Sequence, residues 1–479
     1  MKRLKALAAN HAHSCPPNIR ERAKELGKYF NSLLPGKQLN PLSVREVIAG
    51  SARNKCIEPR SSLGWFTTTI TGATVKGDVV DIVTGEFRDN GGGRWLKEVT
   101  DTQWDLAGRE IRVTYPSETQ AKMETRPEGK EWNPRFIQIV ALPININAQR
   151  VFGPAQDFFS RMGMKSPLLF SIDPLKDWDA LYQGLVEFTD KFAGIDVSAF
   201  DMSQSEEVLL AVGDMVFELY VDQSAQGTQR PTLRNRIRTI MLEHAAMPVQ
   251  LRETLIKAEG GVKSGFQATS FIDASAWLIY IYAAWYESVP AGRDKSASRF
   301  FAEVVTRGIG DDLAFGVKEE VEPYFNHKVL TAWLEKHTLM KVTSMAKDGS
   351  EIVAAPIREL EFCSRKFVPL HNHSSRIIPH IKESSITGAL EWCRNPRDLR
   401  EFYYTAVQQR STLLPYGPKK FRVFERELAA LANEAGITDH VAFTHEDYAE
   451  YLWSALGVPE KDLHRATASD IHSWRTKTD

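Results

Sequence analysis

The sequence predicts an α+β fold, and three patterns indicate this class. Two short apolar runs enclose the Gly-Asp-Asp at 310–312, which is typical of a β-hairpin with a tight turn. Residues 194–197 have the character of a strand, and the apolar spacing over 205–220 predicts a helix directly after it. From residue 371 onward helical periodicity dominates. We therefore expect an antiparallel sheet in the middle of the chain and a helical C-terminal lobe.

Size and composition bound the class of protein. The 479 residues, with a hydrophobic fraction of 43%, are enough to form a large buried core. From the usual size of protein domains, we expect a chain of this length to divide into about three lobes. The formal net charge is −1, so the overall charge does not indicate nucleic-acid binding. Any nucleic-acid channel must come from the local arrangement of the 60 Lys and Arg residues.

Cysteine usage and the apolar runs bear on the compartment. The four cysteines include no Cys-x-x-Cys pair, which argues against a disulfide scaffold or a structural zinc site and suits a reducing compartment. The apolar stretch 6–9 is too short for a secretory signal. The longest apolar run, 274–285, is far shorter than a bilayer requires, so it predicts a buried helix. We expect no membrane span.

The N-terminal half of the chain predicts a mixture of short strands, turns and helices. Three glycines within 89–94 predict the tip of a hairpin, and the lack of a Gly-Lys-Ser/Thr ending argues against a phosphate-binding loop. Residues 135–140 predict a strand, and 148–162 predict an amphipathic helix. The polar and basic stretch 223–262 predicts an insertion between two core elements.

The C-terminal lobe is predicted from repeated amphipathic spacing. Apolar side chains between 399 and 407 fall on one helical face. Asn395 is the expected N-cap of this helix, with Pro396 at its first position. A second set of apolar residues, 421–431, repeats the spacing and predicts another helix.

Two acidic sites carry the chemistry that the residues predict. Asp196 and Asp201 form the first, and Asp311 and Asp312 form the second. Carboxylates from two segments can converge to hold a pair of divalent cations, which is a usual device for phosphoryl transfer to a nucleotide. The pattern therefore predicts a nucleotidyl transferase. Each site also has a structural alternative, because Gly-Asp-Asp is ordinary hairpin-turn chemistry and an Asp before a helix is a common N-cap.

Taken in order, the motifs between about residue 60 and residue 435 resemble the RNA-dependent RNA polymerases of positive-strand RNA viruses, most closely the picornavirus-like group. The resemblance implies a right-hand fold in which an antiparallel-sheet palm lies between fingers and a helical thumb. The implied boundaries are fingers at 1–154, palm at 155–228, a fingers insertion at 229–261, palm at 262–370, and thumb at 371–479.

The resemblance assigns roles to the acidic residues. It implies that Asp196, Asp311 and Asp312 bind two Mg²⁺ ions, for which Mn²⁺ can substitute, and that Asp201 reads the ribose 2′-hydroxyl. Lys347 aligns with a lysine proposed in the family to protonate the departing pyrophosphate, a role suited to an ammonium near an oxyanion. Viewed alone, a lysine beside Asp-Gly is more often a solvated turn residue.

Further positions match nucleotide-binding motifs of the family. Ser264, Gly265, Thr269 and Asp273 resemble a glycine loop and helix that contact the template and the incoming sugar, although the family places Asn where this chain has Asp273. Ser264 or Thr269 can alternatively be read as a helix cap. Three basic residues align with a fingertip motif above the triphosphate, namely Lys122, Arg126 and Arg135.

RNA-binding positions are implied in three further segments. Ser62 and Gly64 resemble the template-entry motif, although a plain Ser/Gly turn fits them equally well. Arg365 and Lys366 resemble a hairpin beneath the primer terminus, where they would contact backbone phosphates. The basic insertion contributes two more candidates, Arg234 and Arg236.

The resemblance implies template-directed addition of ribonucleotides to an RNA 3′ end, replicating a viral RNA genome. The expected partners are RNA template and primer, ribonucleoside triphosphates and other viral replication proteins. The expected location is the host cytoplasm, in a replication complex, or the interior of the virion. Two alternatives stay open: a reverse transcriptase-like polymerase, and an RNA-binding replication protein whose active site has decayed.

Overall fold

A computed structural model shows two compact units, each assembled from separate stretches of the chain. The first unit contains residues 1–122, 130–170 and 195–353, and the second contains 123–129, 171–194 and 354–479. The structure describes residues 15–34, 39–51, 54–122, 135–170, 172–221, 230–251, 253–257, 259–338, 340–344, 351–370, 373–391 and 398–455.

The first unit begins with a helical layer that also holds a short hairpin. Its elements up to residue 170 are α2 (Ile19–Ser32), α3 (Val44–Ala49), α4 (Trp65–Thr71), the 3-10 turn η2 (Lys76–Asp78), β1 (Val80–Asp81), β2 (Glu86–Phe87), α5 (Gly91–Gly108), β3 (Ser117–Ala121), β4 (Phe136–Ile139), α6 (Leu142–Arg161) and η3 (Gly163–Lys165).

The rest of the first unit contains a four-stranded sheet and its helices. The elements are β5 (Phe192–Val197, whose first residues belong to the second unit), α8 (Phe200–Ser203), α9 (Glu206–Tyr220), α10 (Pro231–Ala245), β6 (Val249–Leu251), β7 (Thr254–Ile256), α11 (Thr269–Ser288), α12 (Ala297–Glu303), β8 (Val304–Ile309), β9 (Asp312–Val317), α13 (His327–His337) and β10 (Val342–Ser344).

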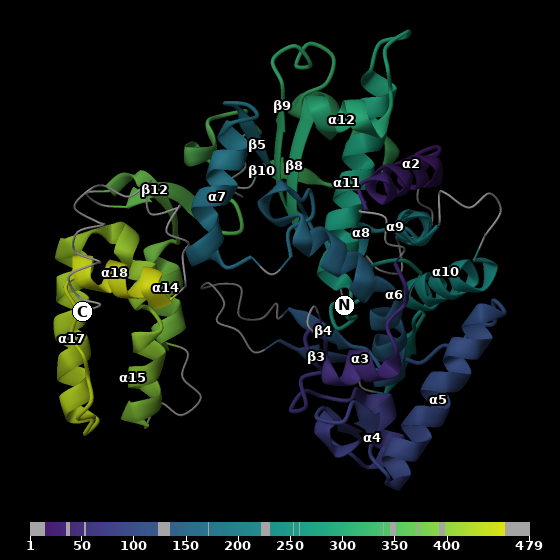
Figure 1. The fold of residues 1–479 in the computed structure, drawn as a ribbon, viewed down its shortest axis with the longest axis horizontal. Coiled ribbons are helices and arrows are strands. Elements are labelled where there is room, and N and C mark those ends of the chain that lie inside the picture. Colours follow the sequence, from purple (N-terminus) through teal and green to yellow (C-terminus); the bar gives the residue numbers. More distant parts are fainter. Residues whose placement is uncertain are drawn as a thin grey trace. The chain divides into compact units, whose positions relative to one another are not determined.

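This sheet has the strand order β10-β5-β9-β8. β10 pairs antiparallel with β5, and β8 pairs antiparallel with β9 from Val304↔Val317 to Ile309↔Asp312. The register confirms the hairpin predicted around 310–312. Helix α11 packs against β8 and β9, and it is seen beside β8 in Figure 1.

Two helices form the centre of this unit's core. Every residue of α11 from Phe271 to Trp285 is buried, and so is every residue of α9 from Val208 to Tyr220. The all-round apolar character of α11 is typical of a helix enclosed on all sides. Helix α2 covers α9 closely, since a Cβ on Gly27 would lie 2.5 Å from the Met215 carbonyl oxygen. The predicted buried helix at 274–285 is therefore confirmed.

A second four-stranded sheet, with order β4-β3-β6-β7, joins the N-terminal layer to the insertion. β3 pairs antiparallel with β4 and parallel with β6. The segment after α9 thus returns to the N-terminal layer, where α10 packs against α5. This agrees with the predicted insertion at 223–262.

The second unit combines one helix from the middle of the chain with the C-terminal elements. It contains α7 (Pro174–Val186), η4 (Ile357–Glu359), β11 (Lys366–Leu370), β12 (His373–His380), α14 (Glu383–Glu391), α15 (Leu399–Val407), α16 (Arg410–Leu413), η5 (Leu414–Tyr416), α17 (Pro418–Glu434) and α18 (His445–Ala455). β11 and β12 form an antiparallel pair, and α7 packs on β12.

Several predicted elements differ from the structure. The glycine-rich stretch 89–94 is not a hairpin tip, because Asn90 caps the Gly93 N–H at 2.7 Å and α5 begins at Gly91. The helix expected at 148–162 begins earlier, at Leu142, since Pro143 is tolerated in a first turn that needs no N–H donor.

The C-terminal lobe also differs at its start. Residues 373–380 form a strand, so the helices begin only at Glu383. The expected cap Asn395 and Pro396 lie outside the described residues. Asp398 caps the following helix instead, because its carboxylate accepts the N–H groups of Arg400 and Glu401 at 3.0 and 3.2 Å.

Candidate active site

The Gly-Asp-Asp turn closes the β8–β9 hairpin at one end of the sheet. Gly310 has φ 59°, a left-handed value that suits glycine in a two-residue hairpin turn. Asp311 follows it in the turn and is exposed, whereas Asp312 opens β9 and is partly buried. The turn therefore presents Asp311 toward solvent at the edge of a rigid ladder.

The other acidic pair is placed by a sharp bend after β5. Asp196 lies in β5 and faces Thr343 of β10 in the register, with the Thr343 hydroxyl 3.4 Å from the Asp196 carbonyl oxygen. Ala199 then adopts the left-handed conformation, with φ 54° and ψ 50°, and α8 begins at Phe200. Asp201 is thus carried on the helix, beyond the bend. Ala199 is the N-cap of α8, so the reading of an aspartate as the helix cap is wrong.

Asp273 of α11 is within electrostatic range of two other aspartates, Asp201 on α8 and Asp311 in the hairpin turn. Asp273 of α11 is 5% exposed, and its Oδ1 is buried without a hydrogen-bond partner. Burial, reinforced by the charges of Asp201 and Asp311, raises the pKa of Asp273 well above its usual range. A concentration of negative charge with an unsatisfied buried oxygen is the environment that a cation or a hydroxyl donor would relieve.

The segment before α11 is hydrogen-bonded to two other parts of the unit, β4 and α6. The Ser264 hydroxyl accepts the Gln138 N–H at 3.0 Å, and the Gly265 N–H donates to the Gln138 carbonyl at 2.9 Å. The Asn145 side chain donates to the Gly265 carbonyl at 3.0 Å and accepts the Gln267 N–H at 2.9 Å. A Cβ on Gly265 would overlap the Gln138 carbonyl oxygen, so only glycine fits against β4.

These contacts exclude the helix-cap alternative for the segment. Ala268 is the N-cap of α11 and no side chain caps it. Thr269 instead donates its hydroxyl back to the carbonyls of Lys263 and Phe266, at 2.8 and 2.7 Å. Ser264 itself is exposed, which leaves its side chain accessible to a ligand.

A buried lysine anchors the same segment. Lys263 is fully buried, and its ammonium donates to the carbonyl oxygens of Ala245, Gly260 and Gly261 at 3.0, 2.7 and 3.2 Å. Burial lowers the pKa of Lys263 to about 7. Because the next residue is Ser264, this lysine fixes the base of the loop that carries the predicted nucleotide contacts.

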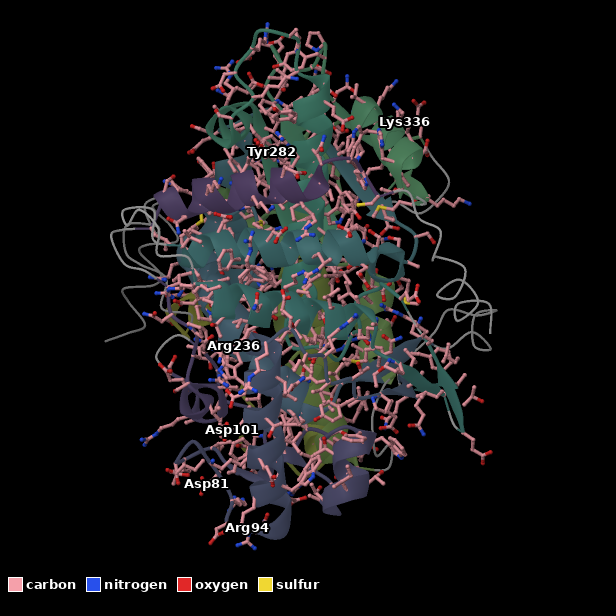
Figure 2. The ribbon with its side chains drawn as sticks, turned by 90° about the vertical axis from the view of Figure 1, so that its right-hand side faces the viewer. Asp81, Arg94, Asp101, Arg236, Tyr282 and Lys336 are labelled. Carbon is pink, nitrogen blue, oxygen red and sulfur yellow. The ribbon has the colours of Figure 1, made fainter. Side chains whose placement is uncertain are left out.

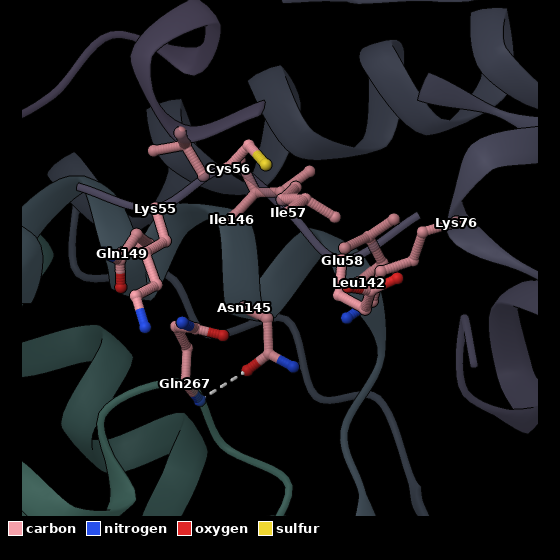
Figure 3. Close-up of a pocket in the computed structure, with 11 residues that line it drawn as sticks. Lys55, Cys56, Ile57, Glu58, Lys76, Leu142, Asn145, Ile146, Gln149 and Gln267 are labelled. Carbon is pink, nitrogen blue, oxygen red and sulfur yellow. Dashed lines mark hydrogen bonds between the residues drawn. The ribbon is translucent and has the colours of Figure 1, made fainter. Parts of the chain in front are cut away.

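A pocket of about 250 Å³ is lined in part by Asn145 (Figure 3). One wall is apolar and includes Ile57 and Ile146, while Gln149 and Gln267 supply amides. Lys55 contributes a cationic group, and its nitrogen is drawn in the lower part of the pocket near Gln149 (Figure 3). Asn145 therefore lines the pocket and also holds the Ser264 loop through its hydrogen bonds to Gly265 and Gln267.

The predicted fingertip residues are placed only in part. Lys122 and Arg135 face each other across the β3–β4 pair, where the Lys122 N–H donates to the Arg135 carbonyl at 2.8 Å, and both side chains are exposed. Arg126 and Lys347 lie outside the described residues. Ser62 accepts the N–H of Gly64 at 3.1 Å, and Gly64 has φ 83° at the start of α4.

The two arginines of the insertion have different surroundings. Arg234 is exposed on α10, with its guanidinium 5.3 Å from the Phe217 ring centroid. Arg236 donates to the Trp104 carbonyl at 3.1 Å and stacks over that indole at 4.4 Å. Its guanidinium also lies 3.9 Å from the carboxylate of Asp105 on α5, and Arg236 is labelled in Figure 2. Arg236 thus has a packing role whether or not it contacts RNA.

In the second unit, Arg365 and Lys366 follow a tight turn. Phe362 and Arg365 form a bridge, and the intervening Cys363 and Ser364 have φ 51° and 58°. Two successive left-handed residues are typical of a type I′ hairpin turn. Arg365 donates to the Cys363 carbonyl at 2.8 Å, and Lys366 is exposed at the start of β11.

Within the described residues, no three His, Cys, Asp or Glu side chains are grouped closely enough to hold a metal ion by themselves. Mg²⁺ commonly takes one or two carboxylates and completes its shell with water and substrate phosphates. The acidic groups described above are consistent with that partial type of site. No helix in the described ranges is both long and apolar enough to span a bilayer.

Comparison with known proteins decides the family. A family model described as "Viral RNA-dependent RNA polymerase" matches residues 55–453. The chain belongs to this polymerase family. The predicted resemblance and enzyme class, a nucleotidyltransferase, are thereby confirmed, and neither a reverse transcriptase nor a decayed polymerase is favoured.

Relatives of this polymerase include segments of viral polyproteins. The genome polyprotein of human hepatitis A virus genotype IIA, isolate CF-53, is 25% identical over 290 residues, and that of genotype IIB, isolate SLF88, is 24% identical. Each alignment covers 59% of this chain and 12% of the polyprotein, so the chain matches only a small part of these relatives' length.

A solved structure shows the same fold. The chain superposes on "Sicinivirus 3Dpol RNA dependent RNA polymerase" with a TM-score of 0.73, at 17% identity, covering 92% of this chain and 85% of the other. The predicted α+β right-hand fold, with an antiparallel palm sheet, is confirmed.

Three residues of the polymerase site were missed from the sequence. Asn145 and Trp277 donate hydrogen bonds to the carbonyls of Gly265 and Asp311, and the Lys263 carbonyl accepts the Thr269 hydroxyl. Asn145 and Trp277 stand in apolar stretches of the sequence, which indicated only that they are buried. Their hydrogen-bond partners, Gly265 and Asp311, are distant in sequence. Lys263 stands directly before Ser264, and its burial has no sequence signal.

Proposed function

We propose that this chain adds ribonucleotides to an RNA 3′ end on an RNA template, with Asp196, Asp311 and Asp312 as the metal-binding residues. The observation that carries the proposal is the buried Oδ1 of Asp273, which has no hydrogen-bond partner and lies within electrostatic range of Asp201 and Asp311. These groups come from three different elements beside the strand that carries Asp196. A purely structural hairpin turn would have no reason to lie beside a buried carboxyl group such as Asp273, whose Oδ1 has no hydrogen-bond partner.

The donor set fits two Mg²⁺ ions. Carboxylate oxygens are the ligands that Mg²⁺ prefers, and the concentrated negative charge here calls for a cation. Bound in pairs, such ions activate the attacking 3′-hydroxyl and neutralise charge on the triphosphate. Mn²⁺, which takes the same oxygen ligands, is expected to substitute.

The ribose is expected to bind between α8 and α11. Asp201 is carried on α8, and Asp273 faces the same charge cluster from α11. The Oδ1 of Asp273, which is buried without a hydrogen-bond partner, would accept a hydrogen bond from a ribose hydroxyl. Ser264 and Gly265, held in position by Gln138, would contact the nucleotide or the template from the adjacent loop.

The remaining contacts complete the proposal. Lys122, Arg126 and Arg135 would neutralise the triphosphate, and Lys347 would donate a proton to the leaving pyrophosphate. Arg234, Arg236, Arg365, Lys366, Ser62 and Gly64 would contact RNA. The fingers, palm and thumb keep the boundaries predicted above.

The proposed setting is a viral replication machinery. The related sequences are segments of genome polyproteins, which supports other viral replication proteins as partners. A replicase of this kind would act in the host cytoplasm.

The test is primer extension on a defined hairpin RNA with Mg²⁺ and ribonucleotides. We expect the wild-type protein to extend the primer, and Asp311→Asn to reduce the rate at least about 10³-fold, because a metal ligand is removed. Asp101→Asn is the matched control. It removes an equivalent carboxylate from an exposed ion pair on α5, 3.1 Å from Lys97, and should leave the rate unchanged. Normal extension by Asp311→Asn would refute the assignment.

A further inference from the structure

Trp277 connects the two catalytic segments of the sheet. It lies in α11 with no exposed surface, and its indole N–H donates to the main-chain carbonyl of Asp311 at 2.9 Å. The same indole stacks on Phe200, with ring centroids 4.7 Å apart and planes inclined by 9°. Phe200 is the first residue of α8, which also carries Asp201.

The position of Trp277 on its helix explains this geometry. It lies four residues after Asp273, so both side chains occupy one face of α11. Asp273 is coupled electrostatically to Asp311, and Trp277 is hydrogen-bonded to that residue's carbonyl. One face of a single buried helix therefore interacts with the turn through a hydrogen bond from Trp277 and an electrostatic coupling to Asp273.

The carbonyl of Asp311 lies in the turn of the hairpin, outside the ladder of strand pairs. In the β8–β9 register Ile309 pairs with Asp312, so Asp311 stands in the turn beyond the ladder. Its carbonyl belongs to the peptide that joins Asp311 to Asp312. Fixing the orientation of this peptide fixes the directions in which both carboxylates leave the main chain.

The indole is suited to this task because it has a single donor and no acceptor. Held flat against Phe200 and buried on all sides, it has little freedom to swing away. The Gly310 turn, in contrast, has open space around it, since a Cβ built on Gly310 meets no atom within 4 Å. The hydrogen bond from α11 therefore restrains the turn at Asp311.

We propose that Trp277 is a positioning residue for nucleotidyl transfer, holding the Asp311–Asp312 peptide so that both carboxylates are directed to the metal ions. This inference rests on the proposed function of these aspartates. Trp277 does not touch the substrate, so its effect should appear in metal use and turnover. Nucleotide affinity should be preserved.

The test compares two tryptophans of the same helix. Trp277→Phe keeps an aromatic ring against Phe200 and removes the donor. Trp285→Phe makes the same chemical change at another fully buried indole of α11, whose N–H donates to the Glu303 carboxylate at 3.0 Å. Glu303 also accepts the Tyr324 hydroxyl at 2.9 Å, so it keeps a partner when the indole is lost.

We expect Trp277→Phe to lower kcat about tenfold and to raise the Mg²⁺ concentration for half-maximal rate several-fold, since small displacements of catalytic groups cost rate steeply. KM for the ribonucleotide should stay within about twofold of wild type, because uniform substrate binding is untouched. Trp285→Phe should match wild type in kcat and in Mg²⁺ dependence.

A second replacement separates the lost hydrogen bond from any change in packing. L-3-benzothienylalanine at position 277 has the shape of tryptophan with sulfur in place of N–H, and it should reproduce the kinetic change without a loss of thermal stability beyond that of Trp285→Phe. Equal kcat and equal Mg²⁺ dependence for the 277 and 285 replacements, with an active wild type, would overturn the inference alone. An inactive wild type would overturn the proposed function and this inference together.

Discussion

Replacing Lys263 by methionine should make the stability of the protein less dependent on pH. The lysine is fully buried and its ammonium contacts three carbonyl oxygens at the base of the Ser264 loop. Methionine has a similar length and no charge. The variant therefore removes one buried titrating group and keeps most of the packing volume.

The magnitude follows from the pKa of the folded and unfolded states. Burial lowers the pKa of Lys263 from 10.5 to about 7, so between these pH values the unfolded chain binds a proton that the folded chain does not. The free energy of unfolding must then rise with pH, by about 1.4 kcal/mol per pH unit. Below about pH 7 both states are protonated and the contribution is flat.

The assay is equilibrium urea unfolding of wild type and Lys263→Met at pH 7.5 and 9.5. Groups common to both proteins cancel in the difference between them. Over these two pH units the wild type should gain about 2–3 kcal/mol relative to the variant. A difference that stays constant with pH would refute the reasoning. It would mean that the three carbonyls hold the side chain as an ammonium throughout.

Three further predictions concern other parts of the chain. Asp273→Asn should become more stable relative to wild type as pH rises from 5 to 8. The pKa of Asp273 is raised in the folded chain, so the unfolded chain ionises this group more readily and the wild type loses stability as pH rises. Thermal unfolding of both proteins at both pH values checks this. Arg410→Met should cost the second unit about 3–5 kcal/mol, since Glu425, 2.7 Å away and 6% exposed, would be left as a buried unpaired charge. Adding Glu425→Met should recover most of that loss, and an unimproved double variant would contradict the explanation. Lys366→Ala should weaken RNA binding and lower the slope of log affinity against log salt by about one, measured by fluorescence anisotropy; an unchanged slope would exclude a phosphate contact.

The parts of the site that were predictable from sequence are the local ones. The turn at 310–312 was visible because its residue types and flanking apolar runs lie within a few positions of each other. The spacing of Asp196 and Asp201 was likewise readable. The bend that makes the spacing useful depends on Ala199 in a left-handed conformation, which no propensity predicts for alanine.

The long-range contacts were not predictable. Helix α11 is apolar on all sides, so periodicity could not show which face meets the catalytic turn. The bond from Trp277 to Asp311 therefore had no sequence signal. The glycines of 91–93 were misread because glycine favours turns, whereas Asn90 supplies the cap that starts α5.

The most direct test of the central claim is whether Asp196 and Asp311 share a metal ion. When hydrogen peroxide and ascorbate are added, Fe²⁺ bound in place of Mg²⁺ reduces the peroxide to hydroxide and a hydroxyl radical, and ascorbate returns the Fe³⁺ to Fe²⁺. The radicals cut the nearby main chain, so the cleavage sites map the ion in the polymerase–RNA–nucleotide complex. We predict cuts near both Asp196 and Asp311 in the wild type, and loss of both sets in Asp196→Asn. Persistence of the cuts near Asp311 in that variant would show that the two aspartates do not hold one ion, which would contradict the account.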